Sequence, residues 1–527
     1  MNLVKAGGTI GGLTFVSRIL GLVREMVVSR VMGASAAADL FVFAFTIPNQ
    51  LRRLLGEGAF SQGFVPLFAR LVAKDGNLDD AKRFAEEVQA VFLPALILIT
   101  VVFVIGMPFI VTLIADKSWS QDPAMFDNAV ALTQITFPYL IFIALVALFS
   151  GILNSLSRFA VAAFVPALLN FALIGALLLV DEGGLATARA MAWAVIVGGV
   201  LQLATLVVST RRAGLKLRLL PPRMTPRVKE LLKLMVPATI AAGGYYISQL
   251  FYLKFATRLE DGSLLYLGQA DRLNQLPLAL IGSAIGVAIL PALSRHIGQA
   301  EHKQASNVQS RATELAMLLT LPATIAMVVI AEPIMTTLFE GQRFTEEDAR
   351  VSGQVLTYMV LGLPAYVMIK ILAPGFFARK DMRTPAIITM ATLAASVAIW
   401  FAFIDDIGII ILPIGTAAAA WINALSLYAL LHRRGHFSLE PWLVTRLLKQ
   451  LFCAGVMAAI LYFLSGVFAD WYAGSGGKKV VAIVATCGAG GIAYLVLAWI
   501  IGAMDKSDVL LLLGKSKFKE ETKEGQA

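Results

Sequence analysis

Long apolar runs separated by short charged segments dominate the chain. Each run approaches the roughly 20 residues that a helix needs to cross a hydrocarbon core about 30 Å thick. Eleven of them hold no Asp, Glu, Lys or Arg: Val91–Ile114, Ala129–Leu153, Phe159–Val180, Ala190–Thr210, Leu234–Leu253, Leu273–Leu293, Leu315–Ala331, Thr384–Ile404, Ile407–Leu431, Leu451–Ala469 and Val480–Met504.

Three further apolar segments carry charges inside them. They are Ala6–Val31, Gly33–Leu51 and Val351–Phe377. Together with the uncharged runs they predict an all-α integral membrane protein with fourteen transmembrane helices.

Composition supports this class. Of 527 residues, 58% are hydrophobic and 15% are charged, whereas soluble domains average about 25% charged residues. Cys453 and Cys487 lie in apolar runs and show no metal-ligand spacing, and the chain has no phosphate-binding loop or hydrolase motif. We therefore expect a transporter with no metal and no cofactor, not an enzyme.

Basic residues test the helix count, because Lys and Arg concentrate in cytoplasmic loops. With a cytoplasmic N-terminus, 31 of the 44 Lys and Arg fall in inner segments and 8 in outer loops. The net charge of +10 thus follows from topology and gives no reason to expect a nucleic-acid partner. Both termini are predicted to be cytoplasmic.

An internal repeat suggests how the helices are organised. Residues 49–70 match residues 274–295 at seven of 22 positions without a gap. We expect two six-helix lobes related by a pseudo-two-fold axis along the membrane normal, plus two extra C-terminal helices. The predicted parts are an N-lobe (1–210), a basic cytoplasmic linker (211–233), a C-lobe (234–432), the added helices (443–504) and a charged cytoplasmic tail (505–527).

Charged side chains inside the predicted helices are candidates for function. A charge facing lipid near the centre of a helix costs about 2.5–3.5 kcal/mol on insertion scales. The excess is cationic, with Arg18, Arg24, Arg52, Arg272 and Lys370 against Asp39, Glu57 and Asp271. Snorkelling or structural ion pairing would explain some of them, and Glu25 can neutralise only one of its two neighbouring arginines. Guanidinium groups bind phosphate through paired hydrogen bonds, so an anionic, phosphorylated cargo is predicted.

These residues also carry a family resemblance. The segments SRILGLVRE (Ser17–Glu25) and AADLFVFAFTIPNQLRRLLGEGAFSQGFVPLFA (Ala37–Ala69) resemble the signature of the MurJ (MviN) lipid II flippases of the multidrug/oligosaccharidyl-lipid/polysaccharide exporter superfamily. YLGQADRLNQLP (Tyr266–Pro277), GQRF (Gly341–Phe344) and KILAPGFFARKDMRTP (Lys370–Pro385) are similar to later motifs of that family.

The resemblance implies a multi-pass protein of the bacterial inner membrane, acting as a monomer on lipid II, the undecaprenyl-pyrophosphate-linked peptidoglycan precursor. It implies substrate-binding roles for Arg18, Arg24, Arg52, Arg272 and Lys370, and supporting or ion-pair roles for Asp39, Glu57, Ser263 and Asp271. One departure is Gln275, where some relatives carry an acid.

Two other transport functions stay open at the level of sequence. A flippase for another polyprenyl-linked glycan would share the cationic residues, because these would bind the phosphates of the cargo and would not distinguish its sugar. A drug/cation antiporter of the same superfamily would need an acidic intramembrane site, which the cationic excess disfavours. A membrane transferase is a third class, but no carboxylate pair or metal cluster is placed for its chemistry.

Overall fold

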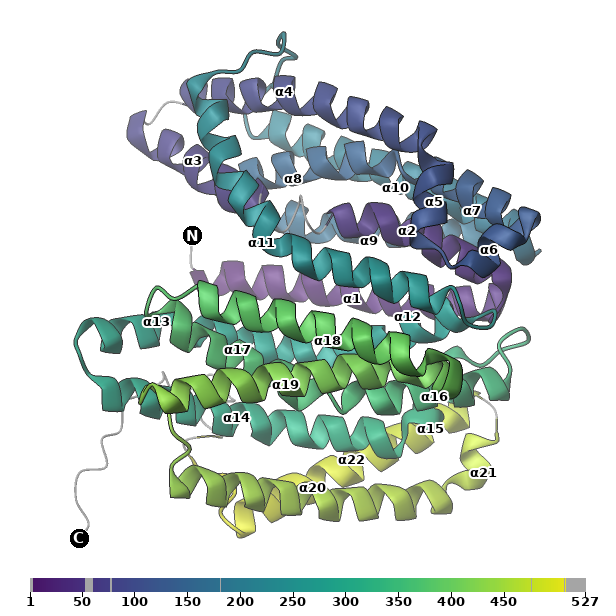
Figure 1. The fold of residues 1–527 in the computed structure, drawn as a ribbon, viewed down its shortest axis with the longest axis vertical. Coiled ribbons are helices and arrows are strands. Elements are labelled where there is room, and N and C mark those ends of the chain that lie inside the picture. The colour runs from purple at the N-terminus through teal and green to yellow at the C-terminus, as the bar shows by residue number, and fades with distance from the viewer. Residues whose placement is uncertain are drawn as a thin grey trace. The chain divides into compact units, whose positions relative to one another are not determined.

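The computed structural model describes residues 3–52, 60–75, 78–180, 182–474, 476–506 and 508. Regular structure in this part of the chain is helical throughout (Figure 1). Contacts divide the chain into two compact units, Met1–Gly268 with Phe339–Asp348, and Gln269–Leu338 with Ala349–Ala527.

The first unit is built from eleven helices and the start of a twelfth among the described residues. These are α1 (Leu3–Met32), α2 (Ala36–Arg52), α3 (Phe60–Asp75), α4 (Leu78–Ile105), α5 (Met107–Ile114), α6 (Lys117–Gln121), α7 (Pro123–Thr136), α8 (Tyr139–Ser155), α9 (Phe159–Leu179), α10 (Gly184–Arg212), α11 (Pro226–Ala256) and α12 (Ser263–Pro277). Helix α9 packs between α1 and α10, while α2 packs on α7 and α10.

Helix α3 lies between the predicted transmembrane helices Gly33–Leu51 and Val91–Ile114, where no helix was predicted from the sequence. Phe60, Phe64 and Phe68 recur every four residues and so share one face of the helix. The Phe64 ring stacks on Phe84 of α4 at 5.5 Å, and its side chain is fully buried. Gly151 lets α8 approach, because a Cβ there would lie 3.0 Å from Phe64. The helix is therefore an integral part of the core of this unit.

The basic segment before α11 is bound to acidic residues of α4. Glu86 accepts a hydrogen bond from the Arg218 backbone N–H at 2.9 Å, and Glu87 accepts one from the Thr225 hydroxyl at 2.8 Å. Thr225 also caps α11 by accepting from the Val228 N–H. The segment expected to act as a linker between lobes is thus fastened to α4, and α11 belongs to the first unit.

The second unit continues from α12 through a π-helical turn (Leu278–Gly282) into α13 (Ser283–Gly298). It then contains α14 (His302–Val329), α15 (Ala331–Phe339), α16 (Glu346–Val360), α17 (Leu363–Phe377), α18 (Arg383–Ile407), a 3-10 turn (Gly408–Ile410), α19 (Ile411–Arg433), α20 (Pro441–Val467), α21 (Ala469–Tyr472) and α22 (Gly476–Ile500). The end of α15 and the start of α16 belong to the first unit.

The two copies of the sequence repeat both begin near the end of a helix. Residues 49–70 begin in α2 and end in α3, with 53–59 outside the described residues, and residues 274–295 begin at the end of α12 and continue through the π turn into α13. Pro277 explains the π turn, since proline lacks an N–H and its ring clashes with the carbonyl four residues earlier.

The second unit packs around α14 and α17. One buried cluster joins α13, α14 and α17 through Leu293, Ala316 and Ile371. Another joins α14 to the C-terminal pair α20 and α22, with the Tyr494 hydroxyl donating to the Leu318 carbonyl at 3.0 Å. The added helices are thus anchored to α14 by both apolar and polar contacts.

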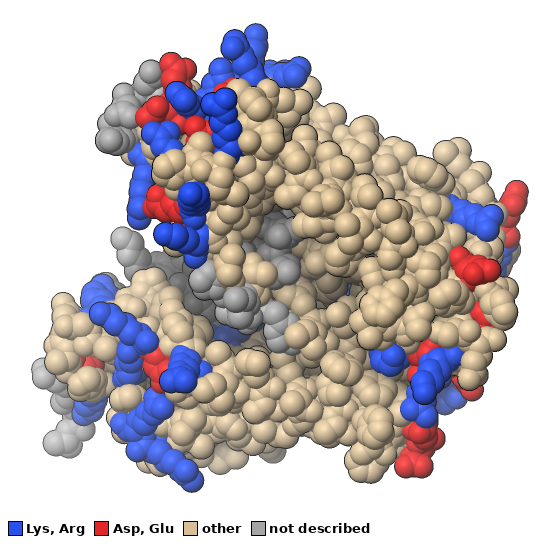
Figure 2. Space-filling model, turned by 45° about the horizontal axis from the view of Figure 1, so that its top comes forward, with Lys and Arg blue, Asp and Glu red and all other residues tan. Residues whose placement is uncertain are grey.

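The surface has the character of a membrane protein. Nine helical segments within the described residues are long and apolar enough to cross a membrane, and one of them, Arg383–Arg433, contains two of the predicted spans. In each unit charged side chains gather toward the ends of the helices, with a belt of uncharged side chains between them (Figure 2). Nearly all-helical architecture with multiple membrane spans is confirmed, while the count of fourteen and the lobe symmetry stay predictions.

Candidate functional site

The Arg24 side chain of α1 is held in a polar network within the first unit. Its Nη1 donates to Asn170 Oδ1 on α9 at 3.1 Å, and Asn170 Nδ2 donates to the Ser17 carbonyl at 3.3 Å. Arg24 also forms an ion pair with Glu25. The guanidinium is thereby oriented and partly neutralised before any ligand binds.

Arg18 has a different environment. It is exposed, and the structure gives its side chain no hydrogen bond or ion pair among the described residues. Glu25 therefore neutralises Arg24, the nearer of the two arginines in sequence, and Arg18 retains its full charge. This is the arrangement expected of a side chain that is available to an anionic ligand.

Arg52 ends α2, where its Nε donates to Asn49 Oδ1 at 2.9 Å. The side chain is half-buried. Glu57, the predicted acidic neighbour, lies outside the described residues. The structure thus describes three predicted cationic residues in the first unit.

Asp39 of α2 caps a helix far away in sequence. Its Oδ2 accepts from the Gly262 N–H at 2.8 Å and its Oδ1 from the Leu265 N–H at 3.1 Å. These donors flank Ser263, the first residue of α12, where N–H groups lack partners within the helix. A carboxylate there also interacts favourably with the helix dipole. Among the described residues, Asp39 acts through this cap and not through an ion pair.

Gly262 makes the approach of Asp39 to α12 possible. Its φ is +89°, a conformation that residues with a Cβ rarely adopt, and a Cβ there would lie 2.6 Å from Ala34 Cβ. Ser263 beside it is buried, with 3% of its surface exposed. Two of the predicted supporting residues, Asp39 and Ser263, therefore lie close together, and Gly262 between their elements is a residue that the sequence did not indicate.

The segment Phe339–Asp348 packs at the same end of the first unit. Arg343 donates to the Val31 carbonyl at the end of α1, and a Cβ on Gly33 would clash with the Arg343 carbonyl oxygen. The Tyr266 hydroxyl of α12 donates to Asp348 Oδ1 at 2.5 Å. The GQRF motif thus holds the turn between α1 and α2 in place. The search for charged residues inside predicted helices did not identify this role, because the motif lies outside them.

The second unit contains the remaining predicted residues. Arg272 on α12 and Lys370 on α17 are both partly buried, whereas Asp271 is exposed. Gln275, the departure from the family pattern, donates a hydrogen bond to Asp271 Oδ2. The Gln275 amide is thus a hydrogen-bond partner of the Asp271 carboxylate.

A charged network that the sequence analysis missed lies where α14, α20 and the turn after α22 meet. The Glu314 carboxylate, with 1% of its side chain exposed, binds Arg446, and it binds Arg311 at 2.8 Å. Arg446 Nη2 also contacts Asp505 Oδ2 at 2.8 Å, and its Nη1 lies 3.3 Å from Asp508 Oδ2. Burial raises the pKa of Asp508 to about 6. Three carboxylates share two arginines here.

Asp381, in the segment between α17 and α18, is also paired. Hydrogen bonds from Arg434, at 2.8 Å, and from Thr384 hold the pKa of this carboxyl well below its usual range. The site residues of the second unit are therefore accompanied by ion pairs that stabilise the ends of its helices.

The fold gives the class of the protein first. Its fold is that of the MOP exporters. The match to an inward-facing MATE family multidrug transporter of that superfamily has a TM-score of 0.64 at 17% identity, covering 79% of this chain and 94% of the other.

The particular family follows from closer comparisons. A family model described as lipid II flippase MurJ matches residues 28–481, and the chain belongs to this family. It is 40% identical over 476 residues to a "Probable lipid II flippase MurJ" of Rhizobium meliloti (strain 1021), covering 90% of this chain and 88% of the relative. It is 36% identical to the "Lipid II flippase MurJ" of Burkholderia cenocepacia, covering 89% and 92%.

A solved structure has the same fold. The match to a lipid II flippase MurJ in an inward closed conformation has a TM-score of 0.76 at 23% identity, covering 93% of this chain and 98% of the other. The family resemblance and the superfamily inferred from the sequence are confirmed, and with them a transport function in place of catalysis.

Proposed function

We propose that this chain carries lipid II from the inner to the outer leaflet of the cytoplasmic membrane of a bacterium. The observation that carries the proposal is the arginine pair of α1, of which Arg18 keeps its full charge and Arg24 is oriented by Asn170 and Glu25. Paired guanidinium donors suit the pyrophosphate of an undecaprenyl-linked precursor. Membership of the lipid II flippase MurJ family supplies the cargo.

The proposed substrate-binding residues are Arg18, Arg24, Arg52, Arg272 and Lys370. Asp39, Ser263 and Asp271 support them, Asp39 by capping α12 and Asp271 through Gln275. Glu57 is proposed as a further supporting acid from sequence alone.

The proposed architecture follows the sequence repeat. Fourteen transmembrane helices form two six-helix lobes, 1–210 and 234–432, joined by the basic segment 211–233. Helices 13 and 14 (443–504) and a charged tail (505–527) follow, and both termini are cytoplasmic. The protein acts as a monomer, without nucleic acid.

Alternating access is the proposed mechanism. One lobe rocks against the other, so that the cationic cavity opens first inward and then outward, and the polyprenyl tail stays in lipid while the headgroup crosses. A net cationic cavity that returns empty is drawn toward a negative interior, and each charge moved through 100 mV gains about 2.3 kcal/mol.

Complementation tests the function directly. The chain should restore growth and peptidoglycan synthesis to a bacterium depleted of its lipid II flippase, and purified protein in vesicles should move lipid II between leaflets without altering it covalently. A chain that reaches the membrane but fails both assays, while moving another polyprenyl-linked glycan, would show that the glycan has been misassigned.

A further inference from the structure

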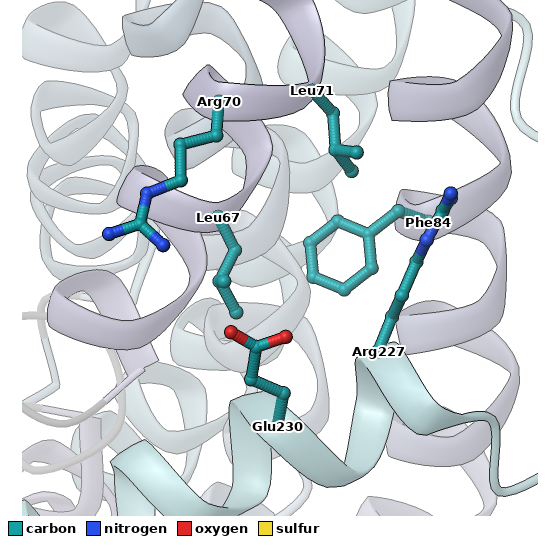
Figure 3. Close-up of a pocket in the computed structure, with 6 residues that line it drawn as sticks. All are labelled: Leu67, Arg70, Leu71, Phe84, Arg227 and Glu230. Atoms are coloured by element: carbon teal, nitrogen blue, oxygen red, sulfur yellow. The ribbon is translucent and has the colours of Figure 1, made fainter. Parts of the chain in front are cut away.

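A small cavity of about 190 Å³ lies between α3, α4 and α11 of the first unit (Figure 3). Its apolar lining comes from Leu67, Leu71 and Phe84. Its polar lining consists of Arg70 from α3, with Arg227 and Glu230 from α11, and the Glu230 carboxylate points toward Leu67 and Phe84 (Figure 3).

Of the three charged side chains in this lining, one forms an ion pair and two have no described partner. Arg227 Nη2 binds Asp80 Oδ2 of α4 at 3.2 Å. Arg70 and Glu230 are exposed, and neither has a hydrogen bond or ion pair with another residue that the structure describes. One guanidinium and one carboxylate therefore line the same cavity without neutralising each other. Such an arrangement complements a ligand that carries both a negative and a positive group.

The surroundings indicate an amphiphile. The cavity lies beside the basic segment that precedes α11, which the charge distribution places on the cytoplasmic side. One turn beyond Glu230 on the same face of α11, Leu234 is 50% exposed. A headgroup in the cavity would thus continue into an apolar chain lying along α11.

We infer that this cavity binds the headgroup of phosphatidylethanolamine from the inner leaflet. The phosphate lies against Arg70, and the primary ammonium donates to Glu230. A primary ammonium has three N–H donors, whereas the trimethylated ammonium of phosphatidylcholine has none, so the site selects between two lipids of equal net charge. The inference is separate from the identity of the transported cargo, and its failure leaves the proposed function untouched.

Native mass spectrometry of the purified full-length protein tests the inference. The probes are phosphatidylethanolamine, phosphatidylcholine and phosphatidylglycerol with identical acyl chains, and free phosphoethanolamine. We expect the wild type to bind phosphatidylethanolamine about tenfold more tightly than phosphatidylcholine, the effect of one charge-assisted hydrogen-bonded pair. Free phosphoethanolamine should bind more weakly than the lipid, because it lacks the acyl chain.

Matched variants assign the selectivity to residues. Glu230→Gln should abolish the preference for phosphatidylethanolamine and leave phosphatidylcholine binding unchanged, while Arg70→Gln should weaken both. Arg212→Gln, an exposed arginine at the end of α10 outside the cavity, is the control and should change neither.

Several results would overturn the inference. These are equal binding of the two zwitterionic lipids by the wild type, a preference that survives Glu230→Gln, and soluble phosphoethanolamine binding as tightly as the lipid. Tighter binding of phosphatidylglycerol that Glu230→Gln strengthens further would instead identify a site for anionic lipids. Melting temperatures of the same samples show that each variant is folded.

Discussion

The Asp39 carboxylate lies 3.1 Å from the backbone nitrogen of Leu265, 226 residues further along the chain, and accepts a hydrogen bond from its N–H. An acid at the start of one predicted membrane helix thus completes the first turn of another. The N–H groups at the start of a helix have no partner within the helix. Where water is excluded, leaving them unpaired costs free energy, so a capping hydrogen bond stabilises the fold most there. Asp39 is 4% exposed.

Removing this cap should destabilise the first unit. Asp39→Ala leaves the buried N–H groups of Gly262 and Leu265 unsatisfied, which we expect to cost about 1–2 kcal/mol. Asp39→Asn retains an oxygen acceptor and should cost less. Thermal unfolding of the purified protein measures both, with Asp470→Ala, an exposed acid of α21, as the control. Equal melting temperatures for Asp39→Ala and the control would contradict the capping role.

Gly262 should tolerate no side chain. Gly262→Ala forces a Cβ to within 2.6 Å of Ala34 Cβ and strains a residue with φ at +89°. The expected loss is about 1–3 kcal/mol. Adding Ala34→Gly removes the shortest contact but leaves two backbone atoms of residue 34 at 3.1 Å and the backbone strain, so the double variant should recover part of the loss in melting temperature. If Gly262→Ala had the melting temperature of the wild type, α12 would be able to shift at this point without loss of stability.

The arginines of α1 should differ in their response to substitution. Lysine keeps the charge but lacks the planar fork, so Arg18→Lys and Arg24→Lys should each reduce lipid II transport by about tenfold or more. Arg30→Lys, at an exposed position at the end of α1, should be harmless. The measurement is the rate of lipid II transport in vesicles that contain each variant at the same protein level. Intact transport in both Arg18→Ala and Arg24→Ala would exclude phosphate binding by this pair.

The contact between Arg24 and Asn170 separates orientation from charge. Asn170→Leu removes both the acceptor for Arg24 Nη1 and the donor to the Ser17 carbonyl without altering net charge. We expect slower transport with normal expression. A transport rate for Asn170→Leu equal to that of the wild type would show that this orientation of Arg24 does not matter.

The Asp508 network predicts a dependence of stability on pH. Burial raises the pKa of this carboxyl to about 6 from an ordinary 3.8, so the folded protein binds a proton more tightly than the unfolded chain. The resulting stabilisation is complete below about pH 4 and is lost as the pH rises through about 6. Asp508→Asn, which mimics the protonated acid, should therefore raise the melting temperature at pH 8 and have little effect near pH 4.

Asp505→Asn provides the contrasting variant for this network. Asp505 contacts Arg446 at 2.8 Å, so removing its charge breaks an ion pair and should lower the melting temperature at pH 8. Identical pH profiles for wild type and Asp508→Asn would exclude the titration of Asp508 in this range.

The sequence predicted the helices well where their apolar runs were uninterrupted. It also predicted that Glu25 would neutralise only one arginine. It missed α3, although Phe60, Phe64 and Phe68 already have the spacing of a buried helix face, because a search for membrane-length runs overlooks a helix of 16 residues.

The tertiary partners of the site residues could not be predicted. Asp39 reads as a candidate for ion pairing, because nothing in its local sequence points to the start of α12. The partners of Arg446 come from α14 and from the turn after α22, so only the packing of these elements brings the network together. The type of residue was enough to select candidates for the site from the sequence. The role of each candidate depends on contacts with residues far away in the chain, which the sequence does not show.

The π turn at Leu278–Gly282 has a consequence for how this chain can vary in length. A π turn accommodates one more residue than the α-helical turn it replaces. Deleting a single residue there would convert the π turn into a regular α-helical turn and leave the helix beyond it in register with α12. A deletion in the α-helical part that follows would instead rotate the rest of α13 by about 100°. Leu293, fully buried against α14 and α17, would then leave its cluster. A single-residue deletion should thus be tolerated in the π turn and not in α13.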